Sequence, residues 1–265
     1  MKYDLHIHSN ISDGKQTREQ ILQKAIEEGL EYISFTEHNK FVPVDCNDNI
    51  NIINGIEFDT YFEKSFHAIM YFKNIDKKIQ DLIQYNNENV NDRSEMLLKQ
   101  INHLHNINVN LEIVQRFFNK KYIFKRDVIE WLISNNYAKS VNEASNKFTG
   151  KNAISYIPKF SVDFKKLVNV SESMGGKLIL AHPSTLRYTS LDLELFIKRL
   201  TSLGLDGIEV INTSKIDKLN SEIYINIANK YNLLTSGGSD FHSFEENKLG
   251  VKGEEAKRLI KTLKF

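Results

Sequence analysis

The chain alternates between two kinds of segment, and this alternation limits the folds open to it more than any other feature. Short runs rich in Ile, Phe and Tyr, such as KYDLHIH at 2–8 and EYISFTEH at 31–38, are typical of strands. Between them, TREQILQKAIEEGL at 17–30 has an apolar stripe at helical spacing and a potential capping box of Thr17 and Gln20. Such a pattern predicts an α/β protein.

Seven strands are expected, most of them followed by a helix. Their ranges are 2–8, 31–38, 51–60, 65–72, 177–182, 206–212 and 233–238. From 76 to 150 the sequence is mostly helical, most clearly at 94–107 and 125–136. We predict an irregular seven-stranded parallel barrel, with a doubly wound sheet as the alternative, formed by 1–75 and 151–265 around a helical insertion at 76–150.

The composition excludes several classes of protein. The 265 residues are 41% hydrophobic and 11% aromatic, which is typical of an ordered globular protein. The formal net charge of +1 gives no overall electrostatic argument for a nucleic-acid or membrane partner. No apolar run suits a signal peptide or a membrane span, and Cys46 is the single cysteine, so no intramolecular disulfide can form. We expect a cytoplasmic protein without a membrane partner.

Histidines and carboxylates recur at the ends of the expected strands. In barrels of this class, catalytic residues come from the carboxyl ends of the strands and the loops that follow. Six of the eight histidines lie in or beside an expected strand, and five lie at or just past a strand end. The histidines and acids near strands are His6, His8, Asp13, Glu37, His38, Glu57, Asp59, His67, His182, Glu209, Asp240 and His242.

Each of these residues has an ordinary explanation when it is taken alone. A single His67 in an apolar strand is typical of a hydrogen-bonded core histidine. Asp13 before Gly14 is typical of a turn, and Glu57 could be a solvated strand end. Their joint placement argues against these explanations, because so many polar groups buried without metal would cost much free energy. We therefore predict a metal site at the mouth of the barrel.

Two histidine pairs share the same spacing, but only one suits a metal. His6 and His8 lie two residues apart in an expected strand, where alternate side chains point to one face. They could therefore bind one ion. His103 and His105 lie in a helical segment, where their directions would diverge by roughly 200°. We interpret the second pair as surface or loop histidines and leave it outside the site.

The predicted site contains imidazoles and carboxylates but no thiolate, which suits Zn, Mn or Fe rather than a structural zinc site. About nine ligands exceed the needs of one ion, so two or three divalent ions are expected. Such a centre can bridge a hydroxide and hold the attacking and leaving oxygens of a displacement at phosphorus. The residues favour hydrolysis of a phosphate ester, with amide hydrolysis as an alternative.

An ordered set of motifs resembles the polymerase and histidinol phosphatase (PHP) superfamily, from residue 2 to about 250. The motifs are HIHSNISDG, FTEHN, GIEF, FHAIMYF, LAHPS and GGSDFH. The resemblance implies a distorted (β/α)7 barrel with a trinuclear metal centre. It assigns His6, His8, Glu57 and Asp240 to one ion, Glu57, His67 and His182 to a second, and Asp13, His38 and His242 to a third.

The insertion looks like that of a bacterial branch that includes nucleoside 3',5'-bisphosphate phosphatases and 5'-to-3' exoribonucleases. In that branch an arginine matching Arg126 contacts phosphate, a role that a bidentate guanidinium suits. Arg187, five residues past His182, is a second candidate in a loop over the barrel mouth. Either could instead be an ordinary surface residue. The resemblance implies that 76–150 is a substrate cap and that the partner is a small phosphorylated substrate, such as a nucleotide or short single-stranded RNA.

Two positions depart from the superfamily pattern. Thr36-Glu37-His38 stands where Thr-Asp-His is usual, so the carboxylate of Glu37, a candidate catalytic group near the third metal, lies one methylene farther out. Val128 stands where the insertion motif usually has a histidine, two residues after Arg126. Both departures bear on the substrate more than on the fold or the metals.

The segment QRFFNKKYIFKR at 115–126, here called the basic segment, interleaves five cations with four aromatic residues. It could stack a base and hold a nucleic-acid strand. The commoner arrangement for such a segment is to pack its rings inward and to solvate its charges.

The sequence as a whole favours a metal-dependent phosphoesterase, in which a metal-bridging hydroxide attacks phosphorus while Arg126 and Arg187 hold phosphate. By resemblance, the favoured substrates are nucleoside 3',5'-bisphosphates or the 5' ends of short RNA. Two alternatives stay open: a histidinol-phosphate phosphatase, and a PHP module that binds metal without catalysis. The bisphosphatase-like insertion argues against the first, and the complete ligand set argues against the second.

Overall fold

The computed structural model describes residues 1–45, 47–157, 161–213 and 221–263. The chain divides into two compact units, Met1–Gln80 with Val162–Phe265 and Asp81–Ser161. Cys46, the single cysteine, lies outside the described residues. Asn220 also lies outside them; it is the first residue of NSEIYINIANKY at 220–231, a segment whose apolar spacing predicts a helix.

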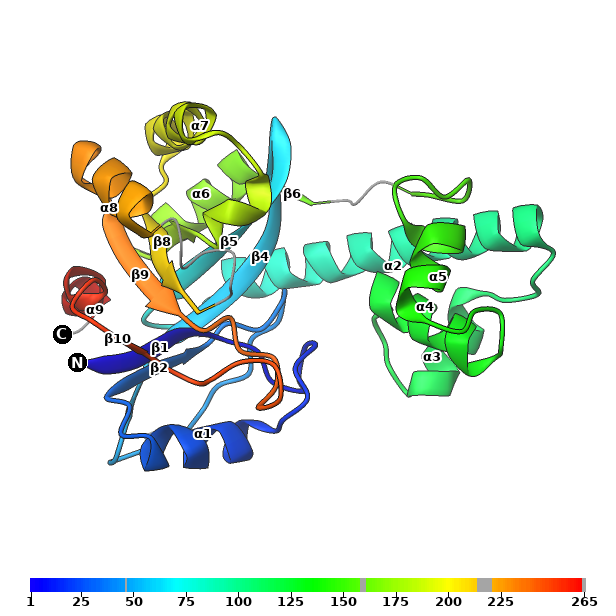
Figure 1. Cartoon of the computed structure of the whole chain (residues 1–265), viewed down its shortest axis with the longest axis horizontal. Helices are drawn as coiled ribbons and strands as arrows, with labels where there is room; N and C mark the ends of the chain where they lie inside the picture. Colours follow the sequence, from blue (N-terminus) through cyan, green and yellow to red (C-terminus); the bar gives the residue numbers. More distant parts are fainter. Residues whose placement is uncertain (46, 158–160, 214–220, 264–265) are drawn as a thin grey trace. The chain divides into compact units, whose positions relative to one another are not determined.

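The first unit is a mixed α/β fold, whose strands and helices can be followed along the chain by colour in Figure 1. Its strands are β1 (Lys2–Ile7), β2 (Tyr32–Phe35), β3 (Asn51–Ile52), β4 (Asn54–Phe62), β5 (Lys64–Phe72), β6 (Val162–Asp163), β7 (Lys177–Leu180), β8 (Gly207–Asn212), β9 (Leu234–Gly238) and β10 (Val251–Lys252). Its helices are α1 (Arg18–Glu27), α6 (Phe164–Ser173), the 3-10 helix η2 (Pro183–Leu186), α7 (Ser190–Leu203), α8 (Ser221–Lys230) and α9 (Lys257–Leu263). The predicted α/β class is confirmed.

The strands form two hydrogen-bonded sheets instead of one closed barrel. One sheet has the order β10-β1-β2-β3, and the other has the order β6-β4-β5-β7-β8-β9. Five neighbouring pairs are parallel: β1–β2, β2–β3, β4–β6, β7–β8 and β8–β9. Isolated bridges at Ile7–Phe241 and His38–Glu57 bring the two sheets together. Histidines and carboxylates of the predicted metal site lie in or beside these bridges.

A regular alternation of strands and helices predicts parallel strands, but β5 runs in the opposite direction. It is antiparallel to both β4 and β7, and only Glu63, with φ at 57°, separates β4 from β5. So short a connection reverses the chain, whereas a parallel pair needs a long crossover. The early residue His67 of β5 therefore lies opposite Asp59, near the end of β4.

The helices of the first unit pack on the sheets through apolar residues. Thr17 caps α1 and forms the capping box with Gln20 that the sequence predicts. Ile21 and Ala25 of this helix pack in one buried cluster with Ile33 of β2. Farther along the chain, α6 packs against β4 and β7, and α8 against β8 and β9. These contacts support the strand ends that carry the polar residues.

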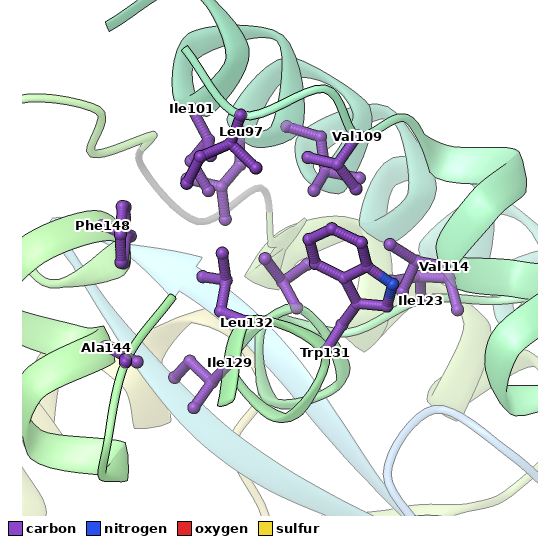
Figure 2. Packing of buried hydrophobic residues seen from close by; sticks show 14 of the residues in the cluster. Leu97, Ile101, Val109, Val114, Ile123, Ile129, Trp131, Leu132, Ala144 and Phe148 are labelled. Atoms are coloured by element: carbon purple, nitrogen blue, oxygen red, sulfur yellow. The ribbon is translucent and has the colours of Figure 1, made fainter. Parts of the chain in front are cut away.

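The second unit is helical, and none of its described residues forms part of a strand. It contains most of α2 (Lys77–His105), together with α3 (Leu111–Phe118), α4 (Lys125–Ser134), α5 (Val141–Ala144) and the π-helix η1 (Ser145–Thr149). Figure 2 shows its core, where Trp131 and Leu132 of α4 pack with Leu97 and Ile101 of α2 and with Phe148 of η1.

Helix α2 has 29 residues and is the longest helix in the described part of the chain. His103 and His105 lie in its last turn, and neither joins a group of potential metal ligands among the described residues. Where the structure describes the chain, no helix has both the length and the apolar character needed to cross a membrane.

Candidate metal centre

All nine predicted metal ligands gather in the first unit. Within the described residues, the side chains that could hold an ion form four overlapping groups, and the potential ligand atoms of each group lie within 4.8 Å of one another. The groups are His8, Asp13, His38 and His242; His6, Glu57 and His182; His6, His8 and Asp240; and His38, Glu57 and His67. No other described residue belongs to such a group.

His6 and His8 approach the same point from the end of β1. Both are fully buried, and their Nε2 atoms lie 3.2 Å apart. Gly238 at the end of β9 allows this approach, because a Cβ there would lie only 2.5 Å from the Cβ of His6. The strand spacing thus turns the two imidazoles towards each other.

The buried carboxylate of Glu57 lies at the centre of the site. Its Oε1 is 3.0 Å from Nδ1 of His67 and 2.9 Å from Nε2 of His182. Its Oε2 is 3.2 Å from Nε2 of His8 and 3.1 Å from Nδ1 of His38. Oε1 also lies 3.5 Å from Nε2 of His6. Oε1 therefore faces three imidazoles and Oε2 faces two, an arrangement in which one carboxylate can serve two ions.

His67 reaches Glu57 because of the β4–β5 hairpin. On its other side, Nε2 of His67 lies 2.7 Å from Oδ1 of Asp59, and the amide of Asn39 donates to Oδ2 of Asp59 at 3.4 Å. A carboxylate on the far nitrogen of a ligand histidine fixes the orientation of the ring. Asp59 is recognisable in the sequence as a strand-end carboxylate, but this role depends on the hairpin pairing.

Glu209 of β8 lies beside His6 in the same way that Asp59 lies beside His67. Its Oε1 lies 3.0 Å from Nδ1 of His6, on the side away from His8. Its Oε2 accepts hydrogen bonds from the backbone N–H of His182 at 2.7 Å and from the amide of Asn212 at 3.3 Å. Glu209 thus holds two predicted ligands in place without belonging to a ligand group.

A second cluster surrounds Asp13. Its Oδ1 lies 3.5 Å from Nε2 of His242 and 3.8 Å from Nδ1 of His8, and its Oδ2 lies 3.8 Å from Nε2 of His38. The ring of His8 stacks on those of His38 and His242, with centroids 4.5 Å apart in both cases. Ligands bound tetrahedrally at about 2.0–2.3 Å from a metal lie roughly 3.3–3.8 Å from one another. The cluster has the dimensions of a metal site.

Two predicted ligands that follow strands have unusual backbone angles. His182 follows β7 with φ at 26°, and Asp240 follows β9 with φ at 51°. Such conformations cost non-glycine residues about 1–3 kcal/mol, and they persist where the surroundings impose them, often at functional sites. The hydrogen bond from His182 to Glu209 is one such constraint.

Against the effect of burial, the acids of the site raise the pKa of four histidines, His6, His8, His67 and His242, and so favour their protonated forms. Burial alone would lower the pKa of His8, but hydrogen bonds to Asp240 and Glu57 outweigh it and raise the pKa to about 10. Burial likewise opposes protonation of His67, yet the charges of Glu57 and Asp59 raise its pKa to about 9. In the absence of metal, protons therefore take the places that cations would occupy.

His38 and two carboxylates shift in the opposite direction. Burial is the main reason why the pKa of His38 is lowered to about 4. Burial would raise the pKa of Glu57, but the charges of His67 and His38 hold it well below its ordinary value. The pKa of Asp13 is also held low, by His242 and His38, against the effect of burial. At neutral pH these carboxylates are ionised and able to bind cations.

Two buried imidazole nitrogens of the site, Nδ1 of His8 and Nδ1 of His38, make no hydrogen bond within the protein. Buried polar atoms in folded proteins are nearly always paired, since leaving them unpaired costs free energy. Imidazole nitrogens and carboxylate oxygens are common ligands of divalent Zn, Mn and Fe. The donor set therefore fits divalent metal ions.

Glu37, one of the three predicted catalytic residues, belongs to none of the ligand groups. It is fully buried, and the side chains of Ser9, Ser12 and Arg18 all donate to its carboxylate. The carboxylate thus binds neighbouring side chains of the protein rather than joining the predicted metal ligands.

The two predicted phosphate-binding arginines belong to different units of the chain. Arg187 is exposed at the end of η2, with φ at 53°. Arg126 is exposed in α4 of the helical unit, where its Nε lies 3.1 Å from Glu130. Val128, where the superfamily usually has a histidine, is fully buried in the core of the same unit. At this position the chain has a packing residue instead of a polar one.

The basic segment exposes one large aromatic ring. The side chain of Phe117 is 54% exposed, and its ring meets that of Phe118 edge to face, with centroids 4.8 Å apart. Lys120 lies over the ring of Phe118 and also pairs with the buried Asp127. One ring of the segment is thus available to a partner, while other parts of it are used in packing.

Two known enzymes resemble the chain over most of its length. The 5'-3' exoribonuclease Rnm of Escherichia coli is 23% identical over 250 residues, which cover 91% of this chain and 85% of that enzyme. The phosphoribosyl 1,2-cyclic phosphate 1,2-diphosphodiesterase of Eggerthella lenta is 26% identical over 257 residues, which cover 90% of this chain and 93% of that enzyme.

Two solved structures share the fold. A predicted metal-dependent phosphoesterase from Bifidobacterium adolescentis superposes with a TM-score of 0.78 at 18% identity, covering 99% of this chain and 96% of that protein. An amidohydrolase from Chromobacterium violaceum with bound sulfate has a TM-score of 0.74 at 19% identity, covering 95% and 92%.

The fold and these similarities define a hydrolytic enzyme, and the ligand groups fit divalent metal ions. The chain belongs to the PHP domain family, whose model matches residues 4–151. The resemblance seen in the sequence motifs is thereby confirmed.

Proposed function

We propose that the chain hydrolyses a phosphomonoester, either of a nucleoside 3',5'-bisphosphate or at the 5' end of a short RNA. The observation that carries this proposal is the environment of Glu57, whose two carboxylate oxygens face five imidazoles. Two or three ions of Mn, Fe or Zn would be held by His6, His8, Asp13, His38, Glu57, His67, His182, Asp240 and His242. Bound there, they would supply Lewis acidity and activate water at neutral pH.

The residues of the chain would orient these ligands and bind the substrate. Glu209 and Asp59 keep the rings of His6 and His67 in place through the nitrogens that face away from the ions. Arg126 and Arg187 are the proposed contacts to phosphate, because a guanidinium offers paired donors to its oxygens.

The helical insertion at 76–150 is the proposed substrate cap. It supplies Arg126, and its basic segment exposes Phe117, a ring on which a base could stack. The named activity of the Escherichia coli relative supports RNA as a substrate. The named activity of the Eggerthella lenta relative supports a phosphodiester as a second candidate.

A substrate panel tests the proposal. The purified protein, with Mn²⁺ added and its metal content measured, is assayed for phosphate release from adenosine 3',5'-bisphosphate, a short 5'-phosphorylated RNA, histidinol phosphate and an aryl phosphate. A cyclic phosphodiester is assayed separately for ring opening. The nucleotide or the RNA should give the highest kcat/KM.

Arg126→Ala should lower kcat/KM on the preferred substrate by roughly 10- to 100-fold, the worth of a hydrogen bond to a charged group. Arg199→Ala is the matched control, since Arg199 is also an arginine paired with a glutamate, Glu63, and lies outside the proposed cap. Turnover of histidinol phosphate or the cyclic diester alone would replace the proposed substrate. No turnover of any compound by metal-loaded protein would refute a catalytic role.

A further inference from the structure

Glu37 is a fully buried carboxylate that the proposed reaction does not use. Ser9 donates to it twice, from its N–H to Oε2 at 3.1 Å and from its hydroxyl to Oε1. Ser12 donates its hydroxyl to Oε2 at 2.5 Å, and Arg18 donates its Nε–H to Oε1 at 3.3 Å. Both oxygens are therefore engaged by the protein, although His38, a predicted ligand, is the next residue in the chain.

The two serines belong to a tight loop that carries Asp13. The N–H groups of Ser12 and Gly14 both donate to the carbonyl of Ser9, at 3.1 and 2.9 Å. Gly14 is needed in this turn, because a Cβ there would lie 2.3 Å from the carbonyl oxygen of His8. Asp13 directly follows Ser12, so the direction of its carboxylate depends on where the loop is held.

Arg18 holds the Glu37 carboxylate in place. It is the first residue of α1 and lies next to the cap at Thr17. It is only 8% exposed, its Nη1 donates to the carbonyl of Val42 at 2.5 Å, and its guanidinium lies 4.9 Å from the centre of the Phe35 ring. The negative charge of Glu37 is thus balanced by a buried cation of the protein itself.

The same arrangement occurs a second time at the site. Asp4 is fully buried and accepts hydrogen bonds from the N–H and the hydroxyl of Ser239, at 2.9 and 2.5 Å. Ser239 directly precedes Asp240, as Ser12 precedes Asp13. In both loops a buried carboxylate outside the ligand groups holds the serine that precedes a predicted metal-binding carboxylate. Its recurrence in two separate loops favours a role at the metal site over ordinary loop packing.

We propose that Glu37 is a positioning residue: by holding Ser12, it directs the carboxylate of Asp13 towards His8, His38 and His242, and so sets the affinity of one metal ion without touching it. This inference rests on the metal-dependent function proposed above. Groups that act through a ligand in this way change metal affinity by about 10- to 100-fold. The ions beside Glu57 have other ligands and should keep their affinities.

Mn²⁺ binding tests the proposal directly. Ser12→Ala removes the contact between Glu37 and the residue before Asp13, but leaves the Arg18–Glu37 pair intact. We expect the dissociation constant of one Mn²⁺ per chain to rise about tenfold or more, with the remaining ions within about twofold of wild type. Ser12→Thr, which keeps the hydroxyl, should restore binding. Ser12→Ala also removes the 3.5 Å contact between the Ser12 hydroxyl and Oδ1 of Asp13. Glu37→Gln, which keeps Ser12, should therefore weaken the same ion, and wild-type binding in this variant would overturn the proposal. Glu37→Asp, which shortens the side chain, tests the same contact if Glu37→Gln does not fold.

Two further variants identify the ion and control for the loss of a hydroxyl. Asp13→Asn should weaken the same ion, and adding Ser12→Ala to it should cause little further loss if both act through one carboxylate. Ser202→Ala removes a serine hydroxyl that bonds to a backbone carbonyl in α7, and should leave all ions unchanged.

The proposal is overturned if Ser12→Ala binds every ion like wild type, or if it weakens all ions equally. It is also overturned if wild-type protein binds no Mn²⁺. Because the readout is metal affinity, a wild-type protein that binds Mn²⁺ but releases no phosphate would refute the proposed function alone. Normal turnover with unchanged Mn²⁺ binding in Ser12→Ala would refute the positioning role alone.

Discussion

The two units bury different kinds of side chain. Among the described residues, the first unit buries the ionisable groups Asp4, His6, His8, Arg18, Glu37, Glu57, Asp59, His182 and Glu209. In the described part of the second unit, Asp127 is the one ionisable residue that is buried. Asp127 is paired with Lys120 and accepts a hydrogen bond from the N–H of Phe124 at 2.8 Å. The other buried side chains that the structure describes in the second unit are uncharged: the hydrophobic ones of Figure 2 form its core, and a few are polar, such as Asn86 and Ser155.

Because of this difference, the two units should be stabilised in different ways and should contribute differently to function. Buried charges are costly unless they are paired, protonated or bound to metal, so the interior of the first unit depends on protons and cations. An apolar interior depends on close packing and is indifferent to both. Changes at the site should therefore alter chemistry and metal binding, whereas changes in the helical core should alter stability.

The largest effect is expected from Glu57→Gln, which keeps the shape of the side chain but removes the charge that five imidazoles face. Losing metal-assisted stabilisation worth several kcal/mol should lower phosphate release by about 10³-fold or more, with loss of bound metal. Steady-state assays together with metal analysis of the purified variant measure both effects.

Glu63→Gln is the matched control for this change. Glu63 lies in the turn of the same β4–β5 hairpin, with its side chain 47% exposed and paired with Arg199. It should retain normal rates and metal content. If Glu57→Gln instead kept the metal content and turnover of wild type, the buried charges of the first unit would not be needed for metal binding or catalysis.

The second prediction concerns the helical core. Leu132 is fully buried in the cluster of Figure 2, and Leu132→Ala should lower the free energy of unfolding by about 2–5 kcal/mol because it leaves a cavity. Trp131 is the single tryptophan of the chain and lies in this core, so its fluorescence reports on the helical unit. Denaturant titrations followed by that signal measure the loss.

Leu104→Ala, at a position that is 38% exposed, should change the unfolding midpoint little. At temperatures where the variant is folded, Leu132→Ala should bind Mn²⁺ like wild type. A metal affinity that fell in proportion to stability would show that the two interiors are coupled.

The strand–helix alternation was sufficient to predict the α/β class, because both periodicities are local properties of the sequence. The antiparallel hairpin was missed, although the interval from 61 to 64 between two expected strands is too short for a crossover. Strands β3, β6 and β10 have two residues each, too few for any periodicity. Two sheets, instead of one seven-stranded barrel, follow from pairings between segments far apart in the chain.

Twelve histidines and acids could be listed from the sequence because strand ends meet at one edge in this class of fold, and the resemblance to the PHP superfamily selected nine of them as ligands. Their grouping was harder to predict, since His38 lies beside Glu57 and His67 as well as beside Asp13. The role of Glu209 could not be foreseen, because its partner His6 is 203 residues away. Strand ends reveal candidate ligands, whereas the supporting contacts depend on pairing across the chain.

The smallest effect is expected from pH acting on protein stripped of metal with a chelator. The pKa values of His8 and His67 are raised to about 10 and 9, so their protonation stabilises the fold fully below the ordinary value of 6.5. That stabilisation is lost as pH rises through 9 and 10. The lowered pKa of His38, about 4, acts only below pH 6.5 and does not oppose this trend.

Metal-free protein should therefore melt several degrees lower at pH 9 than at pH 6.5 when unfolding is followed by circular dichroism. The midpoint reported by Trp131 fluorescence should move less, because few ionisable groups are buried around it. Added Mn²⁺ should stabilise more at pH 8 than at pH 6, because it competes with protons for the same imidazoles. A melting temperature that stays constant or rises from pH 6.5 to 9 would mean that the buried acids do not hold protons on His8 and His67.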